Sequence, residues 1–176
     1  MQGRTVVTGF LPFGGFAVNP AALLAESLGR PFELIEVSFA AVDAFVERVA
    51  SSGEPIDRLV MLGLRGSGTA INLEHVARNH IGPEPDVRGV VRGPGQIDSI
   101  GPQSLSTTLF HVPTEGSWFP STDAGCYLCN YIYYRALRRL RATRVGFVHV
   151  PPSGVIPLDT QRQQLIALLD LIERNG

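Results

Sequence analysis

The sequence lacks three features that would define broad classes of protein. It has no excess of charge, because 15 Lys and Arg residues against 16 Asp and Glu residues give a formal net charge of -1, which provides no electrostatic basis for binding nucleic acid. No apolar run approaches the roughly 20 residues that a membrane span requires, and the first ten residues lack the pattern of a secretory signal. Only two cysteines occur, too few for a disulfide framework. We therefore expect a cytoplasmic protein with free thiols and no nucleic-acid or membrane partner.

Motifs that commonly identify an enzyme class are also missing. The glycine-rich turn at residues 63–68 lacks the lysine of a P-loop and has no matching helix after it, so it predicts no phosphate site. No G-x-S-x-G sequence marks the nucleophile of a serine hydrolase. Cys126 and Cys129 form a C-x-x-C pair, but no second pair of ligands has the spacing of a zinc finger. We expect neither a metal nor another cofactor.

What the sequence does contain is a pattern of alternating elements. Its 176 residues, 44% of them hydrophobic, suit one domain over residues 1–176 with a core that needs no disulfide or metal. Apolar runs alternate with stretches of helical spacing, which predicts an α/β fold with helices on both faces of the sheet. We expect strands at residues 5–8, 32–39, 58–62, 70–77 and 145–150, and helices at residues 21–28, 42–49, 103–109 and 158–173, with a further helix that begins near residue 129 and ends at residue 140.

Two segments show no regular pattern. Residues 79–103 contain repeated Gly and Pro, and a loop of this length inside a compact domain is often a mobile cover over a site. We therefore predict mobility at residues 79–95. Residues 110–120, which include Trp118, are predicted to be a connector.

Three aromatic side chains gather in an early loop. Phe10, Phe13 and Phe16 lie in a Gly/Pro-rich segment directly after the first predicted strand. Such rings either fill the core of the protein or form an aromatic wall for a small, flat ligand. The residue types alone leave both interpretations open.

Three other residues have the chemistry of a cysteine hydrolase. Cys129 lies near a predicted helix start, where free N–H groups and the helix dipole favour a thiolate. His149 ends a predicted strand and is the best candidate for a base, while Glu74 lies among apolar neighbours, where a charge needs a partner. The weaker histidine candidates are His75, His80 and His111. Each residue also has a structural interpretation: a half-buried thiol, a core histidine and a surface carboxylate.

Five segments, taken in order, point to one known family. They are TGFLPFGG at residues 8–15 with Asn19-Pro20, INLE at 71–74, Gly101-Pro102, DAGCYLCN at 123–130 and GFVHVP at 146–151. Together they resemble the pyroglutamyl-peptidase I (pyrrolidone-carboxylate peptidase) family of cysteine peptidases. The resemblance implies an α/β/α sandwich with a mostly parallel, mixed sheet of the phosphorylase/hydrolase type. It also implies removal of an N-terminal pyroglutamyl residue from peptides.

The resemblance assigns roles by position. Cys129 matches the family's nucleophile, His149 its base and Glu74 the residue that orients the base, while Cys126 matches no catalytic position. Aromatic and apolar positions match the pocket that holds the pyroglutamyl ring, and backbone groups of the turn at residues 63–66 would bind the lactam amide. The substrate-binding positions implied are Phe10, Phe13, Phe16, Leu64, Tyr127 and Leu128.

The chain also departs from the family pattern. Leu64 replaces a common Gln, and His75 replaces the Arg that usually follows the glutamate. The segment after Asn79 does not reproduce the sequence DARIPDN, which holds an arginine that helps stabilise the oxyanion in relatives. Arg78 and Arg88 are the candidates to replace that arginine.

Three functions therefore remain open. The first is a peptidase whose partners are peptides with N-terminal pyroglutamate. The second is a non-catalytic binder of such peptides, suggested by the altered turn at 64–68 and loop at 79–95. The third is a dithiol redox protein that uses Cys126 and Cys129. Relatives form homotetramers, and a shortened segment at residues 109–123 leaves the homo-oligomeric state of this chain open.

Overall fold

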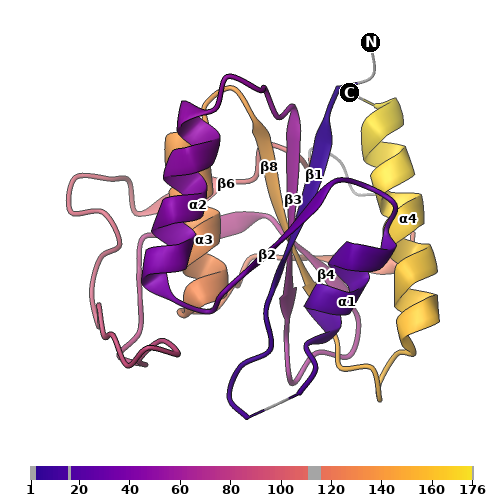
Figure 1. Cartoon of the computed structure of the whole chain (residues 1–176), viewed down its shortest axis with the longest axis horizontal. Helices are drawn as coiled ribbons and strands as arrows, with labels where there is room; N and C mark the ends of the chain where they lie inside the picture. Colours follow the sequence, from indigo (N-terminus) through magenta and orange to yellow (C-terminus); the bar gives the residue numbers. More distant parts are fainter. Residues whose placement is uncertain (1–2, 16, 111–115, 176) are drawn as a thin grey trace.

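The computed structural model describes residues 3–15, 17–110 and 116–175, and it forms three layers around a central sheet (Figure 1). Six strands lie in the order β2-β1-β3-β8-β4-β7. Their bounds are β1 Thr5–Phe10, β2 Phe32–Ile35, β3 Arg58–Leu64, β4 Ile71–Glu74, β7 Trp118–Ser121 and β8 Arg144–Val150. Helices α2 (Phe39–Ser51) and α3 (Leu128–Arg139) cover one face, and α1 (Pro20–Ser27) and α4 (Leu158–Arg174) cover the other. The predicted α/β/α sandwich is confirmed.

The sheet is mixed, as expected, and its one change of direction occurs at β4. Strands β2, β1, β3 and β8 run parallel, so their carboxyl ends meet at one edge. Strand β4 pairs antiparallel with β8 and parallel with β7. The antiparallel register aligns Asn72 with His149 and Glu74 with Phe147. This register brings a residue from the middle of the chain beside the end of the last strand.

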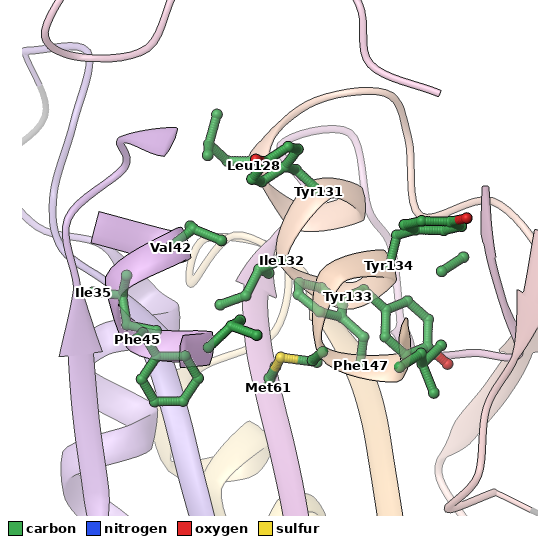
Figure 2. Packing of buried hydrophobic residues seen from close by; sticks show 14 of the residues in the cluster. Ile35, Val42, Phe45, Met61, Leu128, Tyr131, Ile132, Tyr133, Tyr134 and Phe147 are labelled. Atoms are coloured by element: carbon green, nitrogen blue, oxygen red, sulfur yellow. The ribbon is translucent and has the colours of Figure 1, made fainter. Parts of the chain in front are cut away.

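The two faces of the sheet bury separate cores. Since successive strand residues point to opposite faces, Met61 and Phe147 pack under α2 and α3, whereas Leu62 and Val148 pack under α1 and α4. Figure 2 shows the first of these cores, with Met61 and Phe147 against Ile132 and Tyr133 of α3. Continuous apolar runs are expected for parallel strands covered on both faces.

Helix starts depend on polar side chains, some of them distant in sequence. The Asn19 side chain accepts the N–H of Ala21 at 3.0 Å and so caps α1. Ser38 caps α2, and the Asp86 carboxylate accepts the N–H of Phe39 at 2.9 Å. These two caps start α2 at Phe39, so the expected strand over residues 32–39 is shorter and the expected helix over 42–49 longer.

Two further expectations are wrong. Residues 103–109 do not form a helix; β6 (Ser104–Ser106) pairs antiparallel with β5 (Val76–Arg78), and this two-stranded arm satisfies the backbone of both segments. The expected connector contains β7, an edge strand beside β4 that tolerates Pro120 because one side of an edge strand is unpaired. Neither β6 nor β7 has a sequence pattern that predicts a strand, because each is stabilised by pairing with a strand distant in sequence.

The segment at residues 79–95 is irregular but held at several points. Ile81 and Gly95 form an antiparallel bridge, and Gly82 N–H donates to the carbonyl of Cys126 at 2.7 Å. Asp86 accepts three backbone N–H groups, those of Phe39, Arg88 and Val90. The predicted mobility of this segment stays a prediction.

Within the described residues, no helix is both long and apolar enough to cross a membrane.

Candidate active site

The site is assembled from strands β4 and β8 and the first turn of helix α3. Glu74 is the last residue of β4, His149 lies one residue before the end of β8, and Cys129 is the second residue of α3. The Glu74 carboxylate Oε1 lies 2.7 Å from His149 Nδ1, with the two side chains 0% and 5% exposed. A bond from a buried carboxylate to Nδ1 fixes the ring and leaves Nε2 to face the site.

Cys129 lies against the backbone of β3. A methyl group built on Gly63 would approach Cys129 Sγ to 2.8 Å and Phe147 Cζ to 2.6 Å, so only glycine leaves room for the sulfur there. Gly63 is the register partner of His149 in the β3–β8 pair. Cys129 Sγ therefore packs against the β3 residue that is paired with His149, although among the described residues no hydrogen bond joins the thiol to the imidazole.

The surroundings of the Cys129 thiol favour its protonated form. Burial raises the pKa of Cys129 to about 12, Arg65 acts to lower it, and Glu74 acts to raise it further. The sequence predicts a thiolate at this helix start, but loss of solvent around the sulfur outweighs the helix. A base is needed to remove the proton.

Arg65 is a site residue that the sequence analysis missed. Its Nη2 lies 3.4 Å from Glu74 Oε1 and also donates to the carbonyl oxygen of Asp123, just before α3. A single arginine in a glycine-rich turn gives no local signal of this contact. Of the two arginines that the sequence suggested, Arg78 donates to the carbonyl of Thr122 and Arg88 pairs with Glu36, and their role toward an oxyanion stays a prediction.

The loop aromatics divide between core and cavity. Phe10 is only 5% exposed and packs in the core beneath α2 and α3. Phe13 is half-buried and lines a cavity of about 350 Å³ together with Leu64, Asn19 and Pro152. Phe16 lies outside the described residues. Cys129 is not among the residues that line this cavity.

The pair before the nucleophile candidate forms the start of α3. Tyr127 is the N-cap residue, and its hydroxyl donates to the carbonyl of Pro85 at 2.9 Å, which ties α3 to the segment at 79–95. Leu128 is 1% exposed and points into the core near Tyr131 (Figure 2). Their roles toward a substrate stay predictions.

A second missed residue is Asn130. Its fully buried amide accepts the N–H of Arg78 at 2.9 Å and donates to the carbonyls of Arg78 at 2.8 Å and His80 at 2.9 Å. It therefore fixes β5, the strand that follows Glu74, to the helix that carries Cys129. A polar residue on the buried face of a helix was the available signal.

The other histidines and cysteine that the sequence suggested have different surroundings where the structure describes them. The ring of His75 contacts Phe110 with 6.2 Å between centroids, His80 is exposed, and His111 lies outside the described residues. Both cysteines are free; Cys126 is exposed and Cys129 half-buried. In the described part of the chain, no cluster of three His, Cys, Asp or Glu residues is placed to hold a metal ion.

Comparison with known proteins is consistent with this geometry. The sequence model of the pyroglutamyl peptidase family matches residues 3–164. Pyroglutamyl-peptidase 1 of Rattus norvegicus is 34% identical over 169 residues, covering 85% of this chain and 79% of the rat protein. The crystal structure of pyrrolidone carboxyl peptidase from Thermus thermophilus matches with a TM-score of 0.78 at 29% identity, covering 95% and 99% of the two chains.

The fold itself recurs at lower identity. The structure of pyroglutamyl peptidase I from Bacillus amyloliquefaciens superposes with a TM-score of 0.82 at 23% identity, over 98% of this chain and 96% of that one. The family model spans nearly the whole chain, and the rat relative is matched over most of both sequences. The chain therefore belongs to the pyroglutamyl peptidase family of cysteine-type hydrolases.

Proposed function

We propose that this chain hydrolyses the amide bond after an N-terminal pyroglutamyl residue, with Cys129 as nucleophile, His149 as base and Glu74 orienting the base. The observation that carries the proposal is the buried contact of 2.7 Å between His149 Nδ1 and Glu74 Oε1, with Cys129 Sγ packed against Gly63, the register partner of His149. Membership of the family supplies the substrate class.

The reaction follows from the protonation state of the site. Because the pKa of the resting thiol is about 12, His149 Nε2 takes the Cys129 proton as sulfur attacks the pyroglutamyl carbonyl carbon. Glu74 stabilises the imidazolium that results. The C–N bond then breaks as His149 returns the proton to the leaving amine, and a thioester to Cys129 remains. Water, deprotonated by His149, hydrolyses the thioester and regenerates the thiol.

The oxyanion and the ring need partners of different kinds. Backbone N–H groups at the start of α3 are free of intrahelical bonds, so the N–H of Cys129 is available to the tetrahedral oxygen. The lactam ring is uncharged and flat, which suits the half-buried ring of Phe13 and the turn at Leu64. We assign Phe16 and Tyr127 to the surroundings of this ring by family position, whereas Phe10 and Leu128 pack in the core behind the site.

The first test is release of a fluorophore from a pyroglutamyl amide. Wild-type protein is expected to release it, and Cys129→Ala is expected to reduce the rate by at least about 1000-fold, because the nucleophile is lost. Cys126→Ser is the matched control, since this exposed thiol lies three residues away, and it is expected to keep wild-type activity. Hydrolysis that survives Cys129→Ala would refute the assignment of the nucleophile.

The neutral, half-buried thiol favours one second candidate, a binder of pyroglutamyl peptides without turnover. Calorimetric titration of a pyroglutamyl dipeptide separates the two functions. Saturable binding by wild-type protein with no product after prolonged incubation would support the binder and rule out the peptidase.

A further inference from the structure

Glu74 needs more than His149 to remain a buried carboxylate. It is 0% exposed, its Oε1 faces His149, and its Oε2 has no hydrogen-bond partner among the described residues. The hydroxyl of Tyr133 donates to the Glu74 backbone carbonyl, not to the carboxylate. A buried negative charge beside a neutral imidazole is costly unless a cation is near. Within the part of the chain that the structure describes, Arg65 is the arginine that contacts this carboxylate.

The arginine reaches the carboxylate from a fixed backbone. Arg65 N–H continues the β3–β8 ladder by donating to the Val150 carbonyl at 2.9 Å, and Arg65 O accepts Gly68 N–H at 2.8 Å. Its side chain is 29% exposed, so the guanidinium is partly desolvated. Residues two apart along a strand share one face of the sheet. Arg65, two residues after Gly63, therefore projects to the same face on which Cys129 lies against Gly63.

Counting charges shows what Arg65 contributes. In the proposed reaction, while the proton is still on Cys129 and His149 carries none on its second nitrogen, the charges of Arg65 and Glu74 cancel. After the proton moves from sulfur to imidazole, two positive and two negative groups are present and the sum is again zero. Without Arg65 the same site carries a net charge of -1 in both states, and the thiolate forms beside an unbalanced carboxylate. Like charges at close range disfavour ionisation.

We propose that Arg65 is a positioning residue of this site: its guanidinium binds the Glu74 carboxylate and the Asp123 carbonyl, which holds Glu74 toward His149 and sets a positive charge beside Cys129. It acts through Glu74 and through the field at the thiol. This inference rests on the proposed function only in that both concern the same thiol.

The test measures the thiol directly, without requiring turnover. In a Cys126→Ser background, the rate of alkylation of Cys129 by iodoacetamide is followed by mass spectrometry from pH 7 to pH 9, because only the thiolate reacts. Among the described residues, Arg65 from the turn after β3 and Glu74 from β4 act on the pKa of the thiol, and the thiol acts on that of Tyr127 at the start of α3. His149 of β8 is the register partner of Gly63, against which the thiol packs.

Arg65→Met keeps a long side chain and removes the charge, and it is expected to slow alkylation about tenfold at each pH, equivalent to one pKa unit. Arg65→Lys restores the charge and is expected to recover most of the rate. Arg139→Met is the matched control, since Arg139 is the last residue of α3, far along the helix from Cys129, and pairs with the exposed Glu47. It is expected to alkylate at the wild-type rate.

The outcomes separate this inference from the peptidase assignment. The inference would be overturned if Cys129 of Arg65→Met were alkylated at the wild-type rate, if Arg65→Lys failed to recover the rate in a folded protein, or if Arg139→Met slowed alkylation equally. Circular dichroism checks that each variant is folded. If fluorophore release is absent in wild type while alkylation follows the expected pattern, the peptidase proposal fails and the role of Arg65 stands. If wild-type protein releases the fluorophore but Arg65→Met is alkylated at the wild-type rate, the peptidase proposal stands and the role of Arg65 fails.

Discussion

At the scale of single residues, the site depends on a missing side chain as much as on those present. Gly63 has no Cβ, and this alone allows Cys129 Sγ to lie against β3 beside the position of His149. The sequence marks Gly63 only as the beginning of a glycine-rich turn. Its specific role depends on the packing of α3 against the sheet, which no local pattern reports.

We predict that Gly63→Ala lowers the rate of peptide hydrolysis at least tenfold and destabilises the fold by about 1–3 kcal/mol, as overpacking does. The added methyl group would lie 2.8 Å from Cys129 Sγ and 2.6 Å from Phe147 Cζ, so one of them must move. Fluorophore release and urea unfolding measure the two effects.

Gly53→Ala is the matched control for this change. A Cβ at Gly53 meets no atom within 4 Å, so activity and stability are expected to stay near wild type. Equal behaviour of the two variants would show that the space at Gly63 is not required.

The residues of the site were predictable to different degrees. Cys129, His149 and Glu74 stand out because thiol, imidazole and isolated carboxylate are rare types in informative settings, at a helix start and at strand ends. Arg65 and Asn130 do not, because arginine in a turn and asparagine in a helix are ordinary until the fold shows what they contact. The sequence also predicts a thiolate at Cys129, whereas the extent of burial around sulfur depends on tertiary packing.

At the scale of elements, long-range hydrogen bonds decide where helices and loops begin. Asp86 is the main example, since its buried carboxylate accepts the N–H of Phe39 at the start of α2 and two N–H groups of its own loop. Burial would raise its pKa, but these hydrogen bonds outweigh burial and hold the pKa below the usual value of 3.8. The segment at 79–95 and helix α2 are therefore coupled.

We predict that Asp86→Ala destabilises the protein by about 2–3 kcal/mol, because three backbone N–H groups lose their acceptor. Hydrogen exchange should accelerate in residues 79–95 and in the first turn of α2. Asp159→Ala, which removes an exposed carboxylate in the first turn of α4, is expected to cost only a few tenths of a kcal/mol. Unchanged exchange at 79–95 in Asp86→Ala would show that another contact holds this segment.

The elements themselves were predictable where the pattern is local. The cores of β1, β3 and β8 are apolar runs buried on both faces, and α1 and α4 carry a cap or an amphipathic spacing that identifies them. Strands β6 and β7 were not predicted because they are only three and four residues long, with two serines in β6 and a proline in β7. Each is a strand only because a partner lies beside it, β5 for β6 and β4 for β7. The early end of β2 has the same origin, since Ser38 and Asp86 start α2.

At the scale of the whole molecule, ion pairs connect the outer layers to the turns between strands. Arg30, just before β2, binds Asp170 at 2.7 Å and Glu173 at 2.8 Å near the end of α4. Hydrogen bonding to Arg30 outweighs burial and lowers the pKa of Glu173 below 4.5. Asp86 and Asp98 also have lowered pKa values. The homo-oligomeric state stays a prediction at this scale.

We predict that stability falls on acidification through these carboxylates. A carboxylate whose pKa is lower in the folded than in the unfolded protein contributes its full stabilisation above the unfolded value, and that stabilisation is lost as pH falls through the folded value. The urea midpoint should therefore be nearly constant above about pH 5 and decline below about pH 4.5.

Glu173→Gln provides the comparison for this experiment. It should lose about 1 kcal/mol at pH 7, since the pair with Arg30 is partly exposed, and should then decline less steeply in acid than wild type. Parallel curves for the two proteins between pH 3 and pH 7 would exclude Glu173 as a source of acid sensitivity.

The position of β8 has a consequence for the biosynthesis of the protein. This strand is the last of the sheet in sequence, yet it lies between β3 and β4 and pairs with both. A nascent chain that ends before Arg144 already contains Glu74 and Cys129. It lacks the strand that must pair between β3 and β4. His149 arrives only with that final insertion. The ribosome must therefore complete most of the chain before the three residues of the proposed triad can come together, and translation products truncated before β8 are expected to be inert.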